Sequence, residues 1–145
     1  MTRKLQQISL DVKRLQMRHH RAINADLAPL GISLVQWDAL RHIDENPGAS
    51  LHRLAVLTFQ SDPAFGTLAG RMIERGLIER LDRPGRAAQH RLTEKGRSLL
   101  LAGSAVVDEV VARSFAGLTP GQIATFDALI TQLLNSPLDA AGDAS

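Results

Sequence analysis

The 145-residue chain contains no cysteine. This absence excludes catalysis by a thiol, a disulfide framework, a cysteine-based redox sensor and a zinc site with cysteine ligands. Long apolar runs are also missing, because the longest uncharged apolar stretch, 99–107, contains Gly103 and Ser104, whereas a membrane-spanning helix needs about 20 apolar residues. Polar residues rather than an apolar segment follow the N-terminal Met1. We therefore expect no signal peptide and a cytoplasmic location.

Motifs that carry catalysis or bind metals are not found either. The sequence has no glycine-rich phosphate loop, nucleophile elbow or pair of carboxylates spaced for acid–base work, so we do not expect an enzyme. The adjacent Asp44 and Glu45 lie beside a Pro-Gly turn and indicate a solvated helix end. The five histidines form no HxxxH or HExxH pair. We therefore expect no metal and no cofactor.

The residues that are present describe one globular domain, residues 1–145. Apolar residues make up 44% and charged residues 22% of the chain, which is ordinary for a folded protein. The charge is uneven: nine Lys or Arg stand against five Asp or Glu in 50–97, but one stands against five in 98–145. A basic segment inside a folded chain is either a solvated face or a surface for a polyanion.

Apolar periodicity predicts helices for most of the chain, with one interruption. The first helix covers about 4–30, with apolar residues at alternating spacings of three and four. Ser33 and Gln36 form a capping box that starts the second helix. Ser50 is expected to cap a short third helix that holds Leu51, Leu54, Ala55 and Phe59.

Asp62, as N-cap, and Pro63 are expected to open the fourth helix. Its apolar side is predicted to consist of Phe65, Leu68, Ala69, Met72 and Ile73. Two short strands, 77–81 and 88–92, then flank a turn-rich tip and read as a β-hairpin. Long helices follow from Thr93 and from Thr119 to about 135, and the tail 136–145 is expected to fray. The fold class is therefore mainly α with a small β-wing, a winged helix-turn-helix.

Three segments in register resemble the MarR-type transcriptional regulators. Residues 27–37 resemble the family's connection between its first two helices. Residues 75–80 are similar to the end of its recognition helix and its first wing strand, and 86–96 to its second wing strand and the start of the fifth helix. The resemblance implies a winged helix-turn-helix at about 33–92 and dimerisation helices at about 4–30 and 93–135.

The resemblance implies a function as well. It implies a homodimer that binds a near-palindromic operator in double-stranded DNA, most often as a repressor, and that releases DNA on binding a small aromatic or phenolic effector. Two alternatives stay open, namely a winged-helix adaptor for another protein and a constitutive DNA binder without an effector. Activation rather than repression is also open, because it depends on where the operator lies.

Helix geometry and charge indicate which residues contact DNA. On the fourth helix the outward positions are predicted to read bases in the major groove, and the wing arginines to enter the minor groove. The start of the third helix is expected to touch phosphate. These candidates are Ser50, His52, Arg53, Pro63, Ala64, Thr67, Arg71, Arg83 and Arg86.

The wing departs from the family pattern at one position. Pro84 stands where the family usually has an aspartate that holds a wing arginine. One hypothesis is that Asp82 supplies the carboxylate in place of this aspartate. The wing tip is also about two residues shorter than in many members of the family.

Two residues are candidates for effector binding. His19 interrupts the apolar seam of the first helix, and Trp37 points into the region where the family places its ligand pocket. Each also has a structural explanation, since His19 fits a satisfied interface residue and Trp37 packs in a hydrophobic staple with Ile32.

Overall fold

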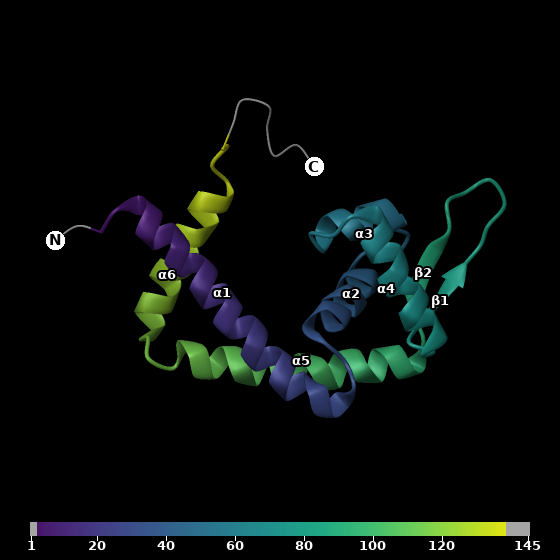
Figure 1. Cartoon of the computed structure of the whole chain (residues 1–145), viewed down its shortest axis with the longest axis horizontal. Helices are drawn as coiled ribbons and strands as arrows, with labels where there is room; N and C mark the ends of the chain where they lie inside the picture. Colours follow the sequence, from purple (N-terminus) through teal and green to yellow (C-terminus); the bar gives the residue numbers. More distant parts are fainter. Residues whose placement is uncertain (1–2, 139–145) are drawn as a thin grey trace. The chain divides into compact units, whose positions relative to one another are not determined.

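The computed structural model describes residues 3–138 (Figure 1). The elements follow in the order α1 (Leu5–Leu27), η1 (Ala28–Leu30), α2 (Leu34–Glu45), α3 (Leu51–Leu57), α4 (Asp62–Glu74), β1 (Ile78–Leu81), β2 (Gln89–Leu92), α5 (Glu94–Phe115) and α6 (Pro120–Leu134). The chain divides into two compact units, one ending at Val110 and one beginning at Val111. The mainly helical fold with a two-stranded wing is therefore as predicted.

Local capping signals explain most of the helix boundaries. Ser33 accepts a hydrogen bond from the Gln36 backbone N–H, and the Gln36 side chain accepts one from the Ser33 N–H, which confirms the predicted capping box of α2. Thr119 and Gln122 repeat the arrangement at α6. Ser50 caps α3 by accepting from the Arg53 N–H. These pairs satisfy backbone donors that a helix start otherwise leaves free.

Two predictions around α4 are wrong. Its N-cap is Ser61, whose Oγ accepts from the Ala64 N–H at 3.2 Å, so Asp62 is the first helical residue. Both types are good N-caps, and the chain uses the earlier one. Ile73, expected in the core, is 38% exposed.

Phe59, predicted to belong to the third helix, is the clearest error, because α3 ends at Leu57. It lies beyond the end of α3, is 98% exposed and has φ of +56°. The left-handed conformation ends the helix and turns the ring away from the core that α3 helps to build.

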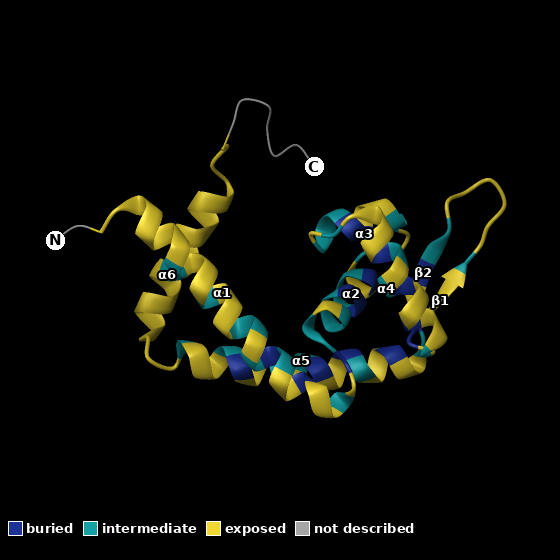
Figure 2. Cartoon of the chain, in the orientation of Figure 1, coloured by how far each residue is buried: buried dark blue, intermediate teal, exposed yellow. Residues whose placement is uncertain are grey.

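The core of the first unit lies where the end of α1, α2, α3, α4, the hairpin and α5 meet. Its fully buried large side chains are Phe65, Leu27, Leu40, Leu54, Met72, Leu77 and Ile78. Figure 2 shows buried positions in these elements, whereas the N-terminal half of α1 has none. In the second unit, α6 has no buried residue, although Phe115 and Phe126 pack edge to face at 5.8 Å.

One close backbone approach fixes the hairpin against the start of α5. The Thr93 N–H donates to the Leu77 carbonyl at 3.0 Å, and the Thr93 hydroxyl accepts from the Gly96 N–H, as its predicted capping role requires. A Cβ on Gly96 would lie only 1.9 Å from the Leu77 carbonyl oxygen. Glycine is therefore the residue that lets the hairpin and α5 come together here.

Candidate nucleic-acid interface

The residues predicted from the sequence to contact bases lie on the exposed face of α4. Pro63, Ala64, Thr67 and Arg71 are all exposed. The Thr67 hydroxyl donates to the Pro63 carbonyl at 3.1 Å, so its proton is already used. The hydroxyl oxygen can still accept a hydrogen bond and the methyl can still pack against a thymine. The side chains on this face are small, apart from that of Arg71.

The candidate residues at the start of α3 are less available for DNA contact than predicted. The Ser50 hydroxyl is occupied as the cap of its own helix. The His52 Nδ1 lies 2.9 Å from a carboxylate oxygen of Asp62, the first residue of α4. Arg53 is exposed and forms no ion pair within residues 3–138. The Arg53 side chain is therefore available to a phosphate without giving up a contact, and His52 has only its Nε2 left for one.

The hairpin has an antiparallel register that pairs Ile78 with Leu92 and Arg80 with His90. At its tip, Gly85 adopts a φ of +74° and the Arg86 N–H donates to the Arg83 carbonyl at 3.2 Å. The tip is therefore shaped by a tight backbone turn.

Both wing arginines are exposed, but Asp82 does not hold either of them. Its carboxylate accepts from the Arg80 Nε at 2.9 Å, so the proposed replacement of the family's aspartate is wrong. Within the described part of the chain, neither Arg83 nor Arg86 has a carboxylate in ion-pair range. Exposed guanidinium groups on a tight turn are suited to the negative potential of a narrow minor groove.

His90 is a buried group on the inner side of the hairpin. It is 9% exposed, and its Nδ1 has no hydrogen-bond partner among residues 3–138. Burial lowers the pKa of His90 below its usual range, and the nearby Arg80 guanidinium lowers it further, against a smaller opposing effect of Asp82. The next residue, Arg91, faces outward and pairs with Glu79. The predicted alternation of these two residues is confirmed.

The two candidate effector residues lie in the first unit and are both half-buried. The Trp37 indole N–H donates to the Ser104 hydroxyl of α5 at 3.1 Å, and the Arg41 guanidinium lies 5.5 Å from the ring centroid. The Trp37 side chain therefore extends from α2 and contacts α5. That His19 and Trp37 bind an effector stays a prediction.

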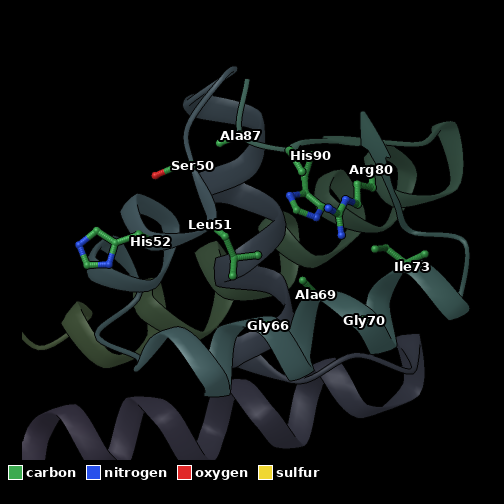
Figure 3. Close-up of a pocket in the computed structure, with 11 residues that line it drawn as sticks. Ser50, Leu51, His52, Gly66, Ala69, Gly70, Ile73, Arg80, Ala87 and His90 are labelled. Atoms are coloured by element: carbon green, nitrogen blue, oxygen red, sulfur yellow. The ribbon is translucent and has the colours of Figure 1, made fainter. Parts of the chain in front are cut away.

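Sequence reasoning missed a hollow of about 500 Å³ between α3, α4 and the hairpin (Figure 3). Neither His19 nor Trp37 lines it. Gly66 and Gly70, spaced four apart on one side of α4, are the signal that the sequence offered, because residues at this spacing share a helix face. The partner wall comes from the hairpin, and its place could not be read from the sequence.

Within residues 3–138, no helix is long and apolar enough to cross a membrane. A search of the same residues finds no group of three or more His, Asp or Glu placed to hold a metal ion.

Known proteins resemble this chain in sequence and in fold. The sequence profile of the MarR family matches residues 30–87. The HTH-type transcriptional repressor Rv2887 of Mycobacterium tuberculosis is 31% identical over 113 residues, which are 77% of this chain and 81% of the relative.

Two solved structures of the M. tuberculosis MarR family protein Rv2887 are similar over nearly the whole chain, each at 27% identity. The complex with p-aminosalicylic acid has a TM-score of 0.75 and covers 90% of this chain and 98% of its own. The complex with DNA has a TM-score of 0.74 and covers 93% and 100%.

Proposed function

Because this chain belongs to the MarR family of transcriptional regulators, we propose that it is a homodimeric repressor of a near-palindromic operator. Its recognition helix α4 enters the major groove, and Arg83 and Arg86 enter the minor groove on either side. The observation that carries the proposal is the combination of an exposed, small-residue face on α4 with two wing-tip arginines that form no ion pair within residues 3–138. The relative that was solved with DNA supports it.

The homodimer is supported by apolar surface that the single chain leaves uncovered. At the start of α1, Leu5 is 84% exposed, and at the end of α6, Leu134 is 76% exposed. Each belongs to a row of exposed apolar residues at helical spacing: Ile8 and Val12 on α1, and Leu129, Ile130 and Leu133 on α6. Contiguous apolar patches on a soluble protein usually mark an interface. We assign these two rows to contacts with a second copy.

An effector of the small aromatic acid class completes the proposal. The similar M. tuberculosis protein has been solved with p-aminosalicylic acid and with salicylic acid. By analogy, we infer that such an acid lowers the affinity of this chain for its operator.

The test is binding to the DNA directly upstream of the chain's own gene, measured by fluorescence anisotropy at 50 and 200 mM salt against a scrambled duplex. If the dimer contacts about six to ten phosphates, the affinity falls by roughly 10³–10⁵ over this salt range. Specific binding with dimer stoichiometry is the expected result. Salt-independent binding contradicts the proposed interface, and absence of any binding at low salt favours the adaptor function.

Arg86→Ala is expected to weaken operator binding. It should also lower the slope of log K against log salt concentration by about two, because each of the two subunits loses one contact to DNA. Its thermal stability is expected to change by less than about 0.5 kcal/mol, because the site is exposed. Arg14→Ala, which removes the same charge from α1, is the matched control. Equal affinities of the two variants would remove the wing from the interface.

A further inference from the structure

A second hollow, here called the arginine pocket, is formed around Arg83, Arg91 and Arg97. It is lined by the end of α2 and the loop that follows, by the hairpin and by the start of α5. Its volume of about 310 Å³ lies at the lower end of the range of about 300–1,000 Å³ that is usual for small-molecule sites. It is separate from the larger hollow of Figure 3, because α3 and α4 contribute no residue to its wall. Its size suits a small metabolite.

The wall of the arginine pocket carries an excess of positive charge. Its three arginines come from separate segments, since Arg83 belongs to the hairpin tip, Arg91 to β2 and Arg97 to α5. One carboxylate, that of Asp44, lines the pocket with them. With its histidine neutral, three positive charges against one negative charge leave the wall with a net charge of +2. A concave wall with charge of one sign attracts small ions of the opposite sign.

The ion pairs of these arginines leave donors for a further acceptor. The Arg97 Nη1 lies 3.0 Å from a carboxylate oxygen of Asp44. The Nε of Arg91 pairs with Glu79, which does not line the pocket. Arg83 has no carboxylate in ion-pair range within residues 3–138. Because a guanidinium group has five N–H donors in a planar fork, all three arginines retain donors for an anion in the pocket.

The remaining wall of the pocket is largely apolar, with one buried polar group. Ile43 and Leu92 are buried and form an apolar floor. His90 is also buried and lines the pocket, and its Nδ1 has no hydrogen-bond partner among residues 3–138. Buried polar atoms in folded proteins nearly always have a partner. His90 borders the larger hollow as well, so the arginines rather than the histidine identify the class of ligand.

We propose that the arginine pocket binds a small phosphorylated metabolite, with the phosphate group held by the three arginines and the carbon part against the apolar floor. Planar guanidinium groups match the oxygens of a phosphate in pairs. A phosphate ester also carries a charge close to −2 near neutral pH, which balances the excess charge of the wall. A carboxylic acid, with a single charge, balances only half of it.

The consequence of this site for regulation rests on the proposed function, because Arg83 is also one of the two wing arginines assigned to the minor groove. A phosphate group that holds Arg83 in the pocket withdraws its guanidinium group from DNA. The phosphorylated ligand and the operator therefore weaken each other's binding by the same factor, as linkage requires. The pocket thus gives the repressor an input separate from its aromatic acid effector.

The first experiment is isothermal titration of the full-length protein with glycerol phosphate, inorganic phosphate and glycerol at pH 7.5, with the ionic strength held constant by chloride. Both phosphates are expected to bind, and glycerol is not. Arg91→Gln and Arg97→Gln should each weaken the binding of glycerol phosphate by about tenfold or more, because each removes hydrogen bonds between charged groups. Arg18→Gln removes the same charge from an exposed position on α1 and serves as the control.

A substitution that strengthens binding tests the pocket without the risk that the variant fails to fold. Asp44→Asn removes the carboxylate of the wall and releases Arg97, so it should tighten the binding of glycerol phosphate by about threefold or more. Glu45→Gln makes the same charge change at the next residue of α2, which does not line the pocket, and should leave the affinity unchanged. Equal affinities of these two variants, or wild-type affinity in Arg97→Gln, would overturn the proposal.

Operator binding separates a free phosphate ester from a phosphate of the DNA backbone. In buffer without phosphate, Arg97→Gln is expected to bind the operator as the wild type does. Glycerol phosphate should then weaken operator binding by the wild type but not by Arg97→Gln. A lower operator affinity of Arg97→Gln without phosphate would mean that the pocket holds the DNA backbone, and would overturn the assignment to a metabolite. A wild type that binds no operator contradicts the proposed function alone, because the titrations of the free protein still decide the pocket.

Discussion

Replacing Phe59 by glycine is expected to make this protein more stable, although it removes a large apolar side chain. The chain ends two helices with the same Schellman motif. After α3, the Gln60 N–H donates to the Ala55 carbonyl at 2.9 Å and the Phe59 N–H to the Val56 carbonyl at 3.1 Å. After α4, the corresponding bonds are both 2.9 Å, and Gly76 occupies the left-handed position. Glycine is the usual residue there.

The magnitude follows from three contributions. Relief of the left-handed conformation gains about 1–2 kcal/mol, because the Cβ of an L-residue crowds its own carbonyl there. The greater freedom of glycine in the unfolded chain costs about 0.5–1 kcal/mol. Phe59 is 98% exposed, so the loss of buried ring area costs only about 0.1 kcal/mol at 25 cal/mol per Å². The net expectation is a gain of about 0.5–1 kcal/mol.

Differential scanning calorimetry measures the effect, which corresponds to a rise in Tm of about 1–4 °C for a chain of this size. Phe59→Ala is the control, because it removes the ring but keeps the Cβ, and its Tm is expected to stay close to that of the wild type. A Tm of Phe59→Gly well below the wild-type value would refute the reasoning. It would mean that the ring is buried in solution, against a second copy or another surface.

Three further substitutions test the packing, the titration and the capping described above. Gly96→Ala is expected to destabilise the fold by about 1–3 kcal/mol or more, because its Cβ would overlap the Leu77 carbonyl, and a chemical denaturation curve that matches the wild type would contradict that approach. His90 has a lowered pKa in the folded chain, so the folded state binds fewer protons than the unfolded state, and stability falls as the pH drops below the unfolded value of about 6.5. His90→Phe removes the part of the stability loss at low pH that comes from protonation of His90. The denaturation midpoints of this variant at pH 7.5 and 5.5 should therefore differ less than those of the wild type. An unchanged difference would exclude His90 as a source of the pH dependence. Ser61→Ala is expected to cost about 1 kcal/mol as the loss of an N-cap, whereas Asp62→Ala should cost clearly less, and the reverse order in thermal melts would restore Asp62 as the cap.

Sequence periodicity and short-range chemistry predicted most of the fold. The capping box that begins at Ser33, the helix that starts at Thr119 and the two hairpin strands were all predicted correctly. Each depends on residues within a few positions of one another, and so the determining contacts are visible in the sequence itself. The errors at Phe59 and Asp62 arose where two local signals competed, apolar periodicity with a helix end and one good cap with another.

The candidate interface was predictable only in outline. An amphipathic wheel placed Thr67 and Arg71 on the outer face of α4, because 3.6 residues per turn fix which positions share a face. No wheel shows that His52 is held by Asp62, or that Asp82 pairs with Arg80 rather than with an arginine of the wing tip. These pairings depend on how helices and strands come together in space.

The sequence alone therefore determined the order of the helices, the wing, their caps and the outward charge of the wing tip. The tertiary structure decided which polar groups make internal contacts and that two glycines of α4 face a groove formed with the hairpin. It also buried His90 with no partner for its Nδ1 in the described part of the chain. The reason is the range of the interactions. Helix caps and turns are set by neighbours along the chain, whereas burial, ion-pair choice and cavities are set by residues that only packing brings together.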